Sequence, residues 1–112
     1  MIKIKIQRQK NKIIYFEIKG HANFSEYGED VICAAVSSVG QMTVNGLIET
    51  LKLKKKLKFT EDDGYISCDL KNSGLTDDEL ENADILVESM YSYLKDVAKS
   101  YKNFVKLREI KK

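Results

Sequence analysis

The first nineteen residues, MIKIKIQRQKNKIIYFEIK (Met1–Lys19), alternate apolar and polar side chains with a period of two. Ile2, Ile4 and Ile6 take every second position before the polar segment QRQKNK, and the alternation resumes at Ile14. This period is typical of a strand with one face against a core and the other in water. The stretch therefore predicts a β-hairpin whose isoleucines face inward.

The period of the apolar residues changes after Asp30. They then recur every three or four positions, which is typical of an amphipathic helix that buries one stripe. Asp30 is suited to be the N-cap of this helix, because its carboxylate can accept hydrogen bonds from first-turn amides. The buried stripe is expected to consist of Ile32, Val36, Val39, Thr43, Leu47 and Leu51.

A second hairpin follows the helix. Asp63 and Gly64, in the segment EDDGY, are a tight-turn signal, because glycine readily adopts the positive backbone dihedral that such a turn needs. Ile66, Cys68 and Leu70 then alternate toward the core. Cys68 is therefore expected to be a packing residue.

A second helix and a last strand complete the pattern. Thr76 and Glu79 match a capping box at the start of the helix, and a strand is expected over residues 104–110. The order of elements predicts an α+β two-layer sandwich in which two long helices cover a mostly antiparallel sheet, as one domain over residues 1–112. The inward stripe of the second helix is expected to be Leu80, Ala83, Val87, Met90, Leu94, Val97 and Tyr101.

The composition is that of an ordinary globular protein. Hydrophobic residues make up 43% and charged residues 32% of the sequence, and the formal net charge is only +2. This balance excludes a disordered chain. The net charge is too small for the electrostatic field of the whole molecule to indicate nucleic-acid binding. We expect no signal peptide, because the alternation begins directly after Met1, and no membrane span, because the uncharged helical stretch is too short.

Two cysteines, Cys33 and Cys68, lie far apart in the sequence. Their spacing matches neither a metal-ligand pattern nor a disulfide framework. The chain is therefore expected to be cytoplasmic, with both thiols free and with no metal or cofactor.

The segment GHANFSEYGEDVICAAVSS (Gly20–Ser38) contains both Cys33 and the single histidine of the chain, His21. With Asp30 as N-cap, Cys33 would be the third helical residue, where the helix dipole and free amides favour a thiolate. We therefore consider a dyad in which His21 is the base and Cys33 the nucleophile. The alternative is that Cys33 is a small core residue and His21 a surface group.

Three neighbouring groups could support such a site. Unpaired amides of Cys33 or Ala34 could bind an oxyanion. Ser37 lies one turn after Cys33 and could hydrogen-bond the imidazole or a substrate carbonyl. Asp30 is either the helix cap or a third catalytic member that orients His21, and we favour the cap.

The segments GHA and GEDVICAAVS resemble the signature of the bacterial ribosomal-processing cysteine proteases, a family of small enzymes called Prp. The family pattern is Gly-His-Ala, a loop of variable length, and then Gly-x-Asp, two aliphatic residues and Cys-Ala-Ala-Val-Ser. The resemblance in length and element order spans nearly the whole chain. The matching positions are Gly20, His21, Ala22, Gly28, Asp30, Cys33, Ala34, Ala35, Val36 and Ser37.

The resemblance implies a Cys33–His21 dyad, with Asp30 and Ser37 as supporting positions. It implies a homodimeric endopeptidase that removes a short N-terminal extension from large-subunit ribosomal protein 27, and that cuts after an aromatic residue. No metal or cofactor takes part in such a reaction.

The recognition peptide of such an enzyme is basic and partly extended, and the segment NFSEYGED could contact it. Phe24 and Tyr27 offer apolar surface. We hypothesise that the segment is a lid that orders on the substrate, with hinges at Gly20 and Gly28; the alternative is a plain solvated loop. The acidic residues available for the positive charge of the peptide are Glu26, Glu29 and Asp30.

The rival function is a non-enzymatic, ribosome-associated module that binds ribosomal RNA or a basic peptide, with His21 and Cys33 only structural. The run KLKKKLK (Lys52–Lys58) is the candidate for a weak RNA contact. A solvated helix end that complements the dipole is the favoured interpretation of this run. Gly40 and Gly46 within the first helix indicate a tight helix contact, which a dimer partner could supply.

Overall fold

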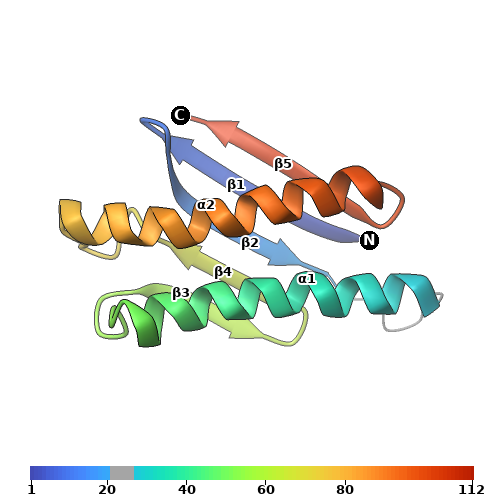
Figure 1. Cartoon of the computed structure of the whole chain (residues 1–112), viewed down its shortest axis with the longest axis horizontal. Coiled ribbons are helices and arrows are strands. Elements are labelled where there is room, and N and C mark those ends of the chain that lie inside the picture. Colours follow the sequence, from blue (N-terminus) through green and yellow to red (C-terminus); the bar gives the residue numbers. More distant parts are fainter. Residues whose placement is uncertain (21–26) are drawn as a thin grey trace.

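The structure, a computed structural model, describes residues 1–20 and 27–112, and for residues 27–30 it describes the backbone alone. In this part of the chain one sheet is covered on one face by two helices (Figure 1). The strands are β1 (Ile2–Gln9), β2 (Lys12–Lys19), β3 (Lys58–Asp62), β4 (Tyr65–Asp69) and β5 (Val105–Lys111), and the helices are α1 (Tyr27–Asn45) and α2 (Asp77–Ser100).

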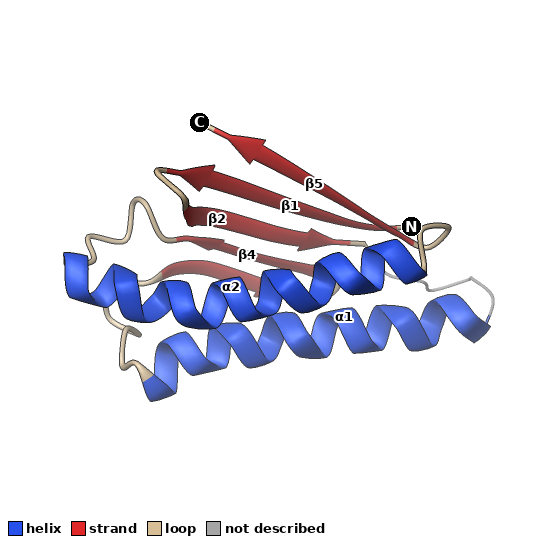
Figure 2. Cartoon of the chain, turned by 45° about the horizontal axis from the view of Figure 1, so that its top comes forward, coloured by secondary structure: helices blue, strands red, loops and turns tan. Residues whose placement is uncertain are grey.

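The sheet has the strand order β3-β4-β2-β1-β5. The pairs β1–β2, β2–β4 and β3–β4 are antiparallel, and β5 lies parallel to β1. Figure 2 shows the two layers, with α1 and α2 side by side on the same face of the sheet. The predicted α+β sandwich with a mostly antiparallel sheet is confirmed.

The first hairpin forms as its alternation predicts. Ile2, Ile4 and Ile6 are buried, and the turn between β1 and β2 consists only of Lys10 and Asn11. Both turn residues have positive φ, 52° and 66°, as the twist of a two-residue hairpin loop requires. The turn is therefore shorter than the polar segment QRQKNK, most of which is strand.

The helices bury their stripes against the isoleucine face of the sheet. In α1 the fully buried positions include Val36 and Thr43. A Cβ on Gly40 would lie 2.6 Å from the Ile18 Cδ1 atom, so the glycine lets the helix approach the sheet closely. The tight contact at this glycine is therefore made inside the chain. In α2 the buried residues are Ala83, Val87, Met90, Leu94 and Val97.

The ends of α2 differ in how well the sequence predicts them. Its start is the predicted capping box: the Thr76 hydroxyl accepts a hydrogen bond of 3.1 Å from the Glu79 amide, and the Thr76 amide donates one of 2.9 Å to the Glu79 carboxylate. Tyr101 was expected in the inward stripe, but it is the exposed C-cap residue where the helix ends.

A π-helical turn, η1 (Gly46–Thr50), continues α1. Together they include Val31–Thr50, 20 residues with a mean hydropathy of 1.5, which by length and composition alone is sufficient to cross a membrane. The expectation that no helical stretch is long enough is therefore wrong. Val36, Val44 and Leu47 of this segment are fully buried against the rest of the fold.

The basic run Lys52–Lys58 lies beyond the helix. Neither α1 nor η1 has a basic residue in its last turn, so the expected complement to the helix dipole is wrong. Leu53 and Leu57 are buried and hold the run against the core, and the Lys56 Nζ atom lies 2.7 Å from the Glu79 carboxylate.

A charged cluster occupies the inward face of the sheet at the end of β1. Arg8 continues the inward alternation of the isoleucines, and its guanidinium donates to both Glu88 oxygens at 2.5 and 2.7 Å and to Glu109 at 2.9 Å. Tyr91 also donates a hydrogen bond to Glu109, and its ring lies 4.7 Å from the guanidinium carbon. Because Glu88 is on α2 and Glu109 on β5, Arg8 links three elements.

Arg8→Met should lower the free energy of unfolding by about 2 kcal/mol, because it leaves Glu88 and Glu109 half-buried without their cation. Urea unfolding followed by circular dichroism measures the change. Lys106→Met removes the same charge from an exposed position of β5 and should change stability by no more than about 0.5 kcal/mol. Equal effects of the two substitutions would contradict a structural role for the cluster.

The same cluster predicts a pH dependence. The hydrogen bond from Tyr91, and then Arg8, hold the pKa of Glu109 below its ordinary value of 4.5. A carboxyl whose folded pKa is lowered stabilises the fold above the ordinary value and loses that contribution as pH falls through the folded pKa. The stability difference between the wild type and Arg8→Met should therefore shrink below about pH 4. A difference that is constant down to pH 3 would contradict this.

Candidate active site

Cys33 is the seventh residue of α1, because the helix begins at Tyr27. Asp30 was expected to be the N-cap of a helix that begins after it, but it is the fourth residue of the helix, so that prediction is wrong. The amides that a helix start leaves unpaired belong to the N-cap and the first three helical residues, here 27–29. The amides of Cys33 and Ala34 lie beyond them, and the proposed oxyanion site at these two amides is therefore wrong as well.

The helix start also changes the electrostatic argument for the thiol. The dipole effect falls off within the first turn of a helix, and Cys33 lies in the second turn. The expected position of Cys33 in the first turn is therefore wrong.

The Cys33 side chain is half-buried and meets the end of β2. Its Sγ atom lies 3.8 Å from the carbonyl oxygen of Gly20, within reach of a weak S–H hydrogen bond. His21 is the next residue in the sequence after Gly20. The structure thus brings the thiol to the point in the chain directly before the histidine.

Gly20 is held in an unusual backbone conformation. Its φ is +110°, and a Cβ at this position would lie only 2.6 Å from the Met1 carbonyl oxygen. Its amide donates a hydrogen bond of 2.9 Å to the Gly64 carbonyl in the β3–β4 turn. Only glycine adopts this geometry without strain, so Gly20 fixes where β2 ends beside Cys33. Sequence reasoning missed the contacts to Met1 and Gly64, because no local pattern marks them.

Ser37 lies one helical turn after Cys33, as its spacing predicts. Both side chains are half-buried, and residues four apart occupy the same side of a helix. Ser37 is therefore close enough in the helix to act beside the thiol, and its role stays a prediction.

Several predicted site residues fall in or next to the part of the chain that is not described. His21, Phe24 and Glu26 lie outside the described residues. The side chains of Tyr27 and Glu29 are also outside them, but their backbone is helical. Gly28, expected as a loop hinge, is the second residue of α1, and the segment before the helix is therefore shorter than the sequence indicated.

Cys68 differs from Cys33 in every respect that matters for reactivity. It is completely buried in β4, and desolvation raises the pKa of its thiol to about 12. A thiol with this pKa carries almost no thiolate at neutral pH. The prediction that Cys68 is a core residue is confirmed.

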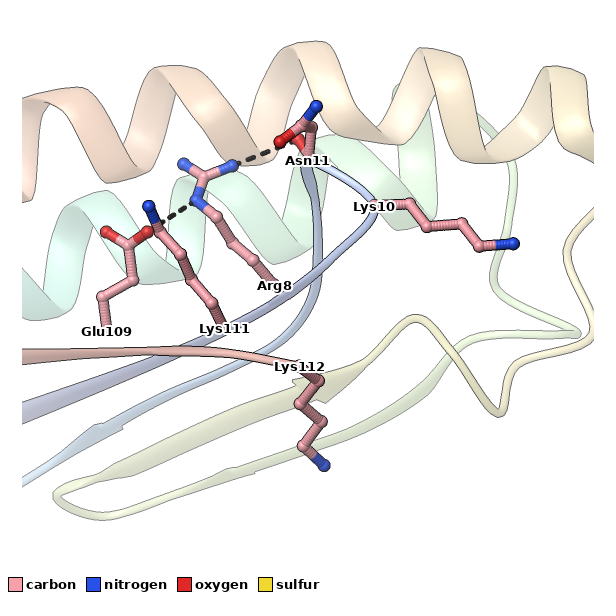
Figure 3. A pocket seen from close by; sticks show the side chains of 6 residues that line it. All are labelled: Arg8, Lys10, Asn11, Glu109, Lys111 and Lys112. Atoms are coloured by element: carbon pink, nitrogen blue, oxygen red, sulfur yellow. Dashed lines mark hydrogen bonds and ion pairs between the residues drawn. The ribbon is translucent and has the colours of Figure 1, made fainter.

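A polar hollow of about 530 Å³ lies at the opposite end of the sheet from Gly20. Arg8, which is already engaged by carboxylates, forms its floor, and in Figure 3 Lys10 and Lys112 extend away from the guanidinium. This hollow contains no thiol and is separate from the Cys33 site. Among residues 1–20 and 27–112 no group of three His, Cys, Asp or Glu side chains is arranged to hold a metal ion.

Comparisons with known proteins agree on one family. The family model described as Cysteine protease Prp matches residues 1–106. The Ribosomal processing cysteine protease Prp of Bacillus subtilis is 36% identical over 104 residues, which is 92% of each chain.

Two solved structures share the fold. SMU.848 from Streptococcus mutans is 31% identical with a TM-score of 0.79, over 100% of this chain and 96% of its own. The ribosomal processing protease Prp from S. aureus, in complex with a covalently linked product peptide, is 26% identical with a TM-score of 0.74, over 97% of this chain and 99% of its own.

Iodoacetamide should label Cys33 at least about tenfold faster than Cys68 at pH 7, because Cys33 is partly exposed and Cys68 is buried with a raised pKa. Mass spectrometry of tryptic peptides over a time course measures both rates in one sample. Labelling in 6 M urea is the control, since it should make the two rates similar. Equal rates in the native protein would contradict the different environments of the two thiols.

Proposed function

This chain is a cysteine protease of the Prp family, and we propose that it removes a short N-terminal extension from large-subunit ribosomal protein 27 during ribosome maturation. Relatives named for ribosomal processing support the process, and the peptide-bound S. aureus structure supports a peptide substrate. The identity of the ribosomal protein rests on the resemblance of the GHA and GEDVICAAVS segments to the family signature. The comparisons give no support to a non-enzymatic module.

The proposed nucleophile is Cys33. The observation that carries this assignment is the 3.8 Å approach of its half-buried Sγ atom to the Gly20 carbonyl, directly before His21 in the sequence. Cys68, the other thiol, is buried and protonated at neutral pH, so it cannot serve.

The proposed reaction has two stages. His21 takes the thiol proton, and the Cys33 thiolate attacks the scissile carbonyl carbon to form a tetrahedral intermediate. The C–N bond then breaks, His21 donates its proton to the leaving amine, and a thioester remains on Cys33. Water, deprotonated by His21, attacks the thioester and releases the new carboxylate and the thiol.

The residues before and within the first turn of α1 remain the proposed substrate contacts. Phe24 and Tyr27 would meet apolar groups of the peptide, and Glu26, Glu29 and Asp30 would attract its basic side chains. Since Asp30 is not the helix cap, its place in the motif is better explained by a role toward His21 or the peptide. The lid predicted for the segment NFSEYGED, with hinges at Gly20 and Gly28, lies largely outside the described residues and stays a prediction.

We also propose a cytoplasmic homodimer joined through its helices. From Val31 to Ile48 the sequence contains no charged residue, although several positions of this segment are exposed. Val31 is 51% exposed and Met42 is 66% exposed on α1, and Ile85 is 68% exposed on the neighbouring α2. An uncharged outer face with large apolar side chains fits a protein interface.

Cys33→Ala and Cys33→Ser should each lower the rate of cleavage by about 10³-fold or more, because no other accessible thiol is available. His21→Ala should have a comparable effect. The assay follows release of the N-terminal extension from the extended ribosomal protein by mass spectrometry.

Cys68→Ala is the matched control for these substitutions. It should keep the cleavage rate within about twofold at a temperature where its fold is intact, because Cys68 only packs in the core. Cleavage by Cys33→Ala would contradict the mechanism. Cleavage of an unrelated basic peptide but not of the extended ribosomal protein would contradict the proposed identity of the substrate.

Met42→Lys should raise the dimer dissociation constant about tenfold or more, since it places a charge in the proposed interface. Sedimentation equilibrium at micromolar concentrations measures it. Thr60→Lys adds the same charge to the exposed edge strand β3 and should leave the dimer unchanged. A monomeric wild type, or a dimer that tolerates Met42→Lys, would contradict this interface.

A further inference from the structure

The face of the sheet that the helices leave open carries a concentrated patch of positive charge. Register places Lys3 of β1 between Lys19 of β2 and Lys106 of β5. It places Lys5 between Glu17 of β2 and Arg108 of β5. These five cations surround a shallow hollow of about 250 Å³. We call them the basic face.

Within the described part of the chain, the basic face is opposed only by Glu17, which is paired across the strands with Lys5. None of its five cations has an ion-pair partner among residues 1–20 and 27–112; Lys5 alone makes a polar contact, with its ammonium 6.0 Å from the centre of the Tyr15 ring. Glu17 is the single carboxylate that lines the hollow, and its Oε1 atom accepts hydrogen bonds from Tyr15 at 2.7 Å and Tyr65 at 3.1 Å.

Repulsion between the cations of the basic face should lower the stability of the fold when no anion is bound. Like charges on directly paired residues of neighbouring strands repel each other, and Lys3 has a lysine on both sides. The whole chain has a net charge of only +2, so five cations on three adjacent strands are a local concentration, not a property of the composition. An anionic partner with several charges would relieve the repulsion.

We propose that the basic face binds single-stranded RNA, with phosphates on the five cations and bases against Tyr15 and Tyr65. Strands lie about 4.8 Å apart and alternate residues on one face about 6.7 Å apart, so the cations form a regular array on a flat surface. The two tyrosines are half-buried on the same face at its β2–β4 side, where single-stranded RNA could stack. Each is paired across the strands with an aspartate, Tyr15 with Asp69 and Tyr65 with Asp62, so the phosphates would lie on the β1–β5 side.

The chemistry of the face favours RNA over the other anionic partners. The one apolar residue that lines the hollow, Ile4, is buried, so the hollow itself offers no apolar side chain to a lipid surface. A basic peptide would be repelled, which separates this face from the peptide site at Cys33. The row of Lys106, Lys3 and Lys19 lies at the end of the sheet next to Gly20, so bound RNA would reach toward the same end of the molecule as the thiol.

The run Lys52–Lys58 is a poorer RNA site than the basic face. It is anchored by buried Leu53 and Leu57, and Lys56 is paired with Glu79. Lys54 and Lys55 are exposed and unpaired among the described residues, so they provide a control with the same charge as the pair Lys106 and Arg108.

The test is fluorescence anisotropy of a labelled 12-nucleotide single-stranded RNA, titrated with the protein at 50 to 200 mM KCl. Five phosphate contacts predict that the logarithm of the binding constant falls with the logarithm of salt concentration with a slope of about −3.5. The double variant Lys106→Gln/Arg108→Gln should bind at least about tenfold more weakly at 100 mM KCl, with a slope nearer −2. Lys54→Gln/Lys55→Gln should bind within about twofold of the wild type.

Cleavage of a free peptide substrate by the Lys106→Gln/Arg108→Gln variant shows whether it is folded, and the rate should be unchanged. Equal loss of RNA affinity in the two double variants would overturn the proposal, because net charge alone would then explain binding. Binding to phosphatidylserine vesicles without binding to RNA would also overturn it. Because RNA binding is measured without cleavage, it stands or fails separately from the proposed proteolysis.

Discussion

Burial of one face of the β1–β2 hairpin beneath α1 and α2 is the constraint on which the rest of the structure depends. Ile4, Ile6 and Phe16 on this face are completely or almost completely buried, and burial of each such side chain contributes about 1.5–3 kcal/mol. The apolar stripes of both helices can be covered only there. Among residues 1–20 and 27–112 no helix or strand covers the opposite face of the sheet. The exposed cations on that face include Lys3, Lys19, Lys106 and Arg108.

Local patterns predict most of this architecture, because period two and period three to four are properties of neighbouring residues. They do not predict the pairing of β1 with β5, which joins residues a whole chain apart, or the contacts of Gly20 with Met1 and Gly64. Arg8 shows the same limit. Its position continues the isoleucine alternation, but its partners Glu88 and Glu109 come from α2 and β5, so an inward arginine is explained only after the elements are assembled.

At the candidate site, two residues that commonly mark the end of a loop and the start of a helix lie inside the helix. Glycine and aspartate are unfavourable or neutral inside helices, so Gly28 and Asp30 indicated a loop and a cap. The helix begins earlier and includes both, and Cys33 moves from the first turn to the second. The dyad of Cys33 and His21 is predicted from residue type and family motif, and it stays a prediction. The approach of the thiol to Gly20 depends on the positive φ at the end of β2, which no spacing encodes.

The parallel pairing of β1 with β5 also sets an order of events during synthesis. The outer edge of β1 receives its partner only when Val105–Lys111 has been made, after every other element of the described chain. Until then a nascent chain carries an uncovered strand edge that could pair with another polypeptide. Lys3 and Lys5, which alternate with the isoleucines along that edge, are the kind of side chain that discourages such pairing. The charges of the open face would then act first as protection against aggregation.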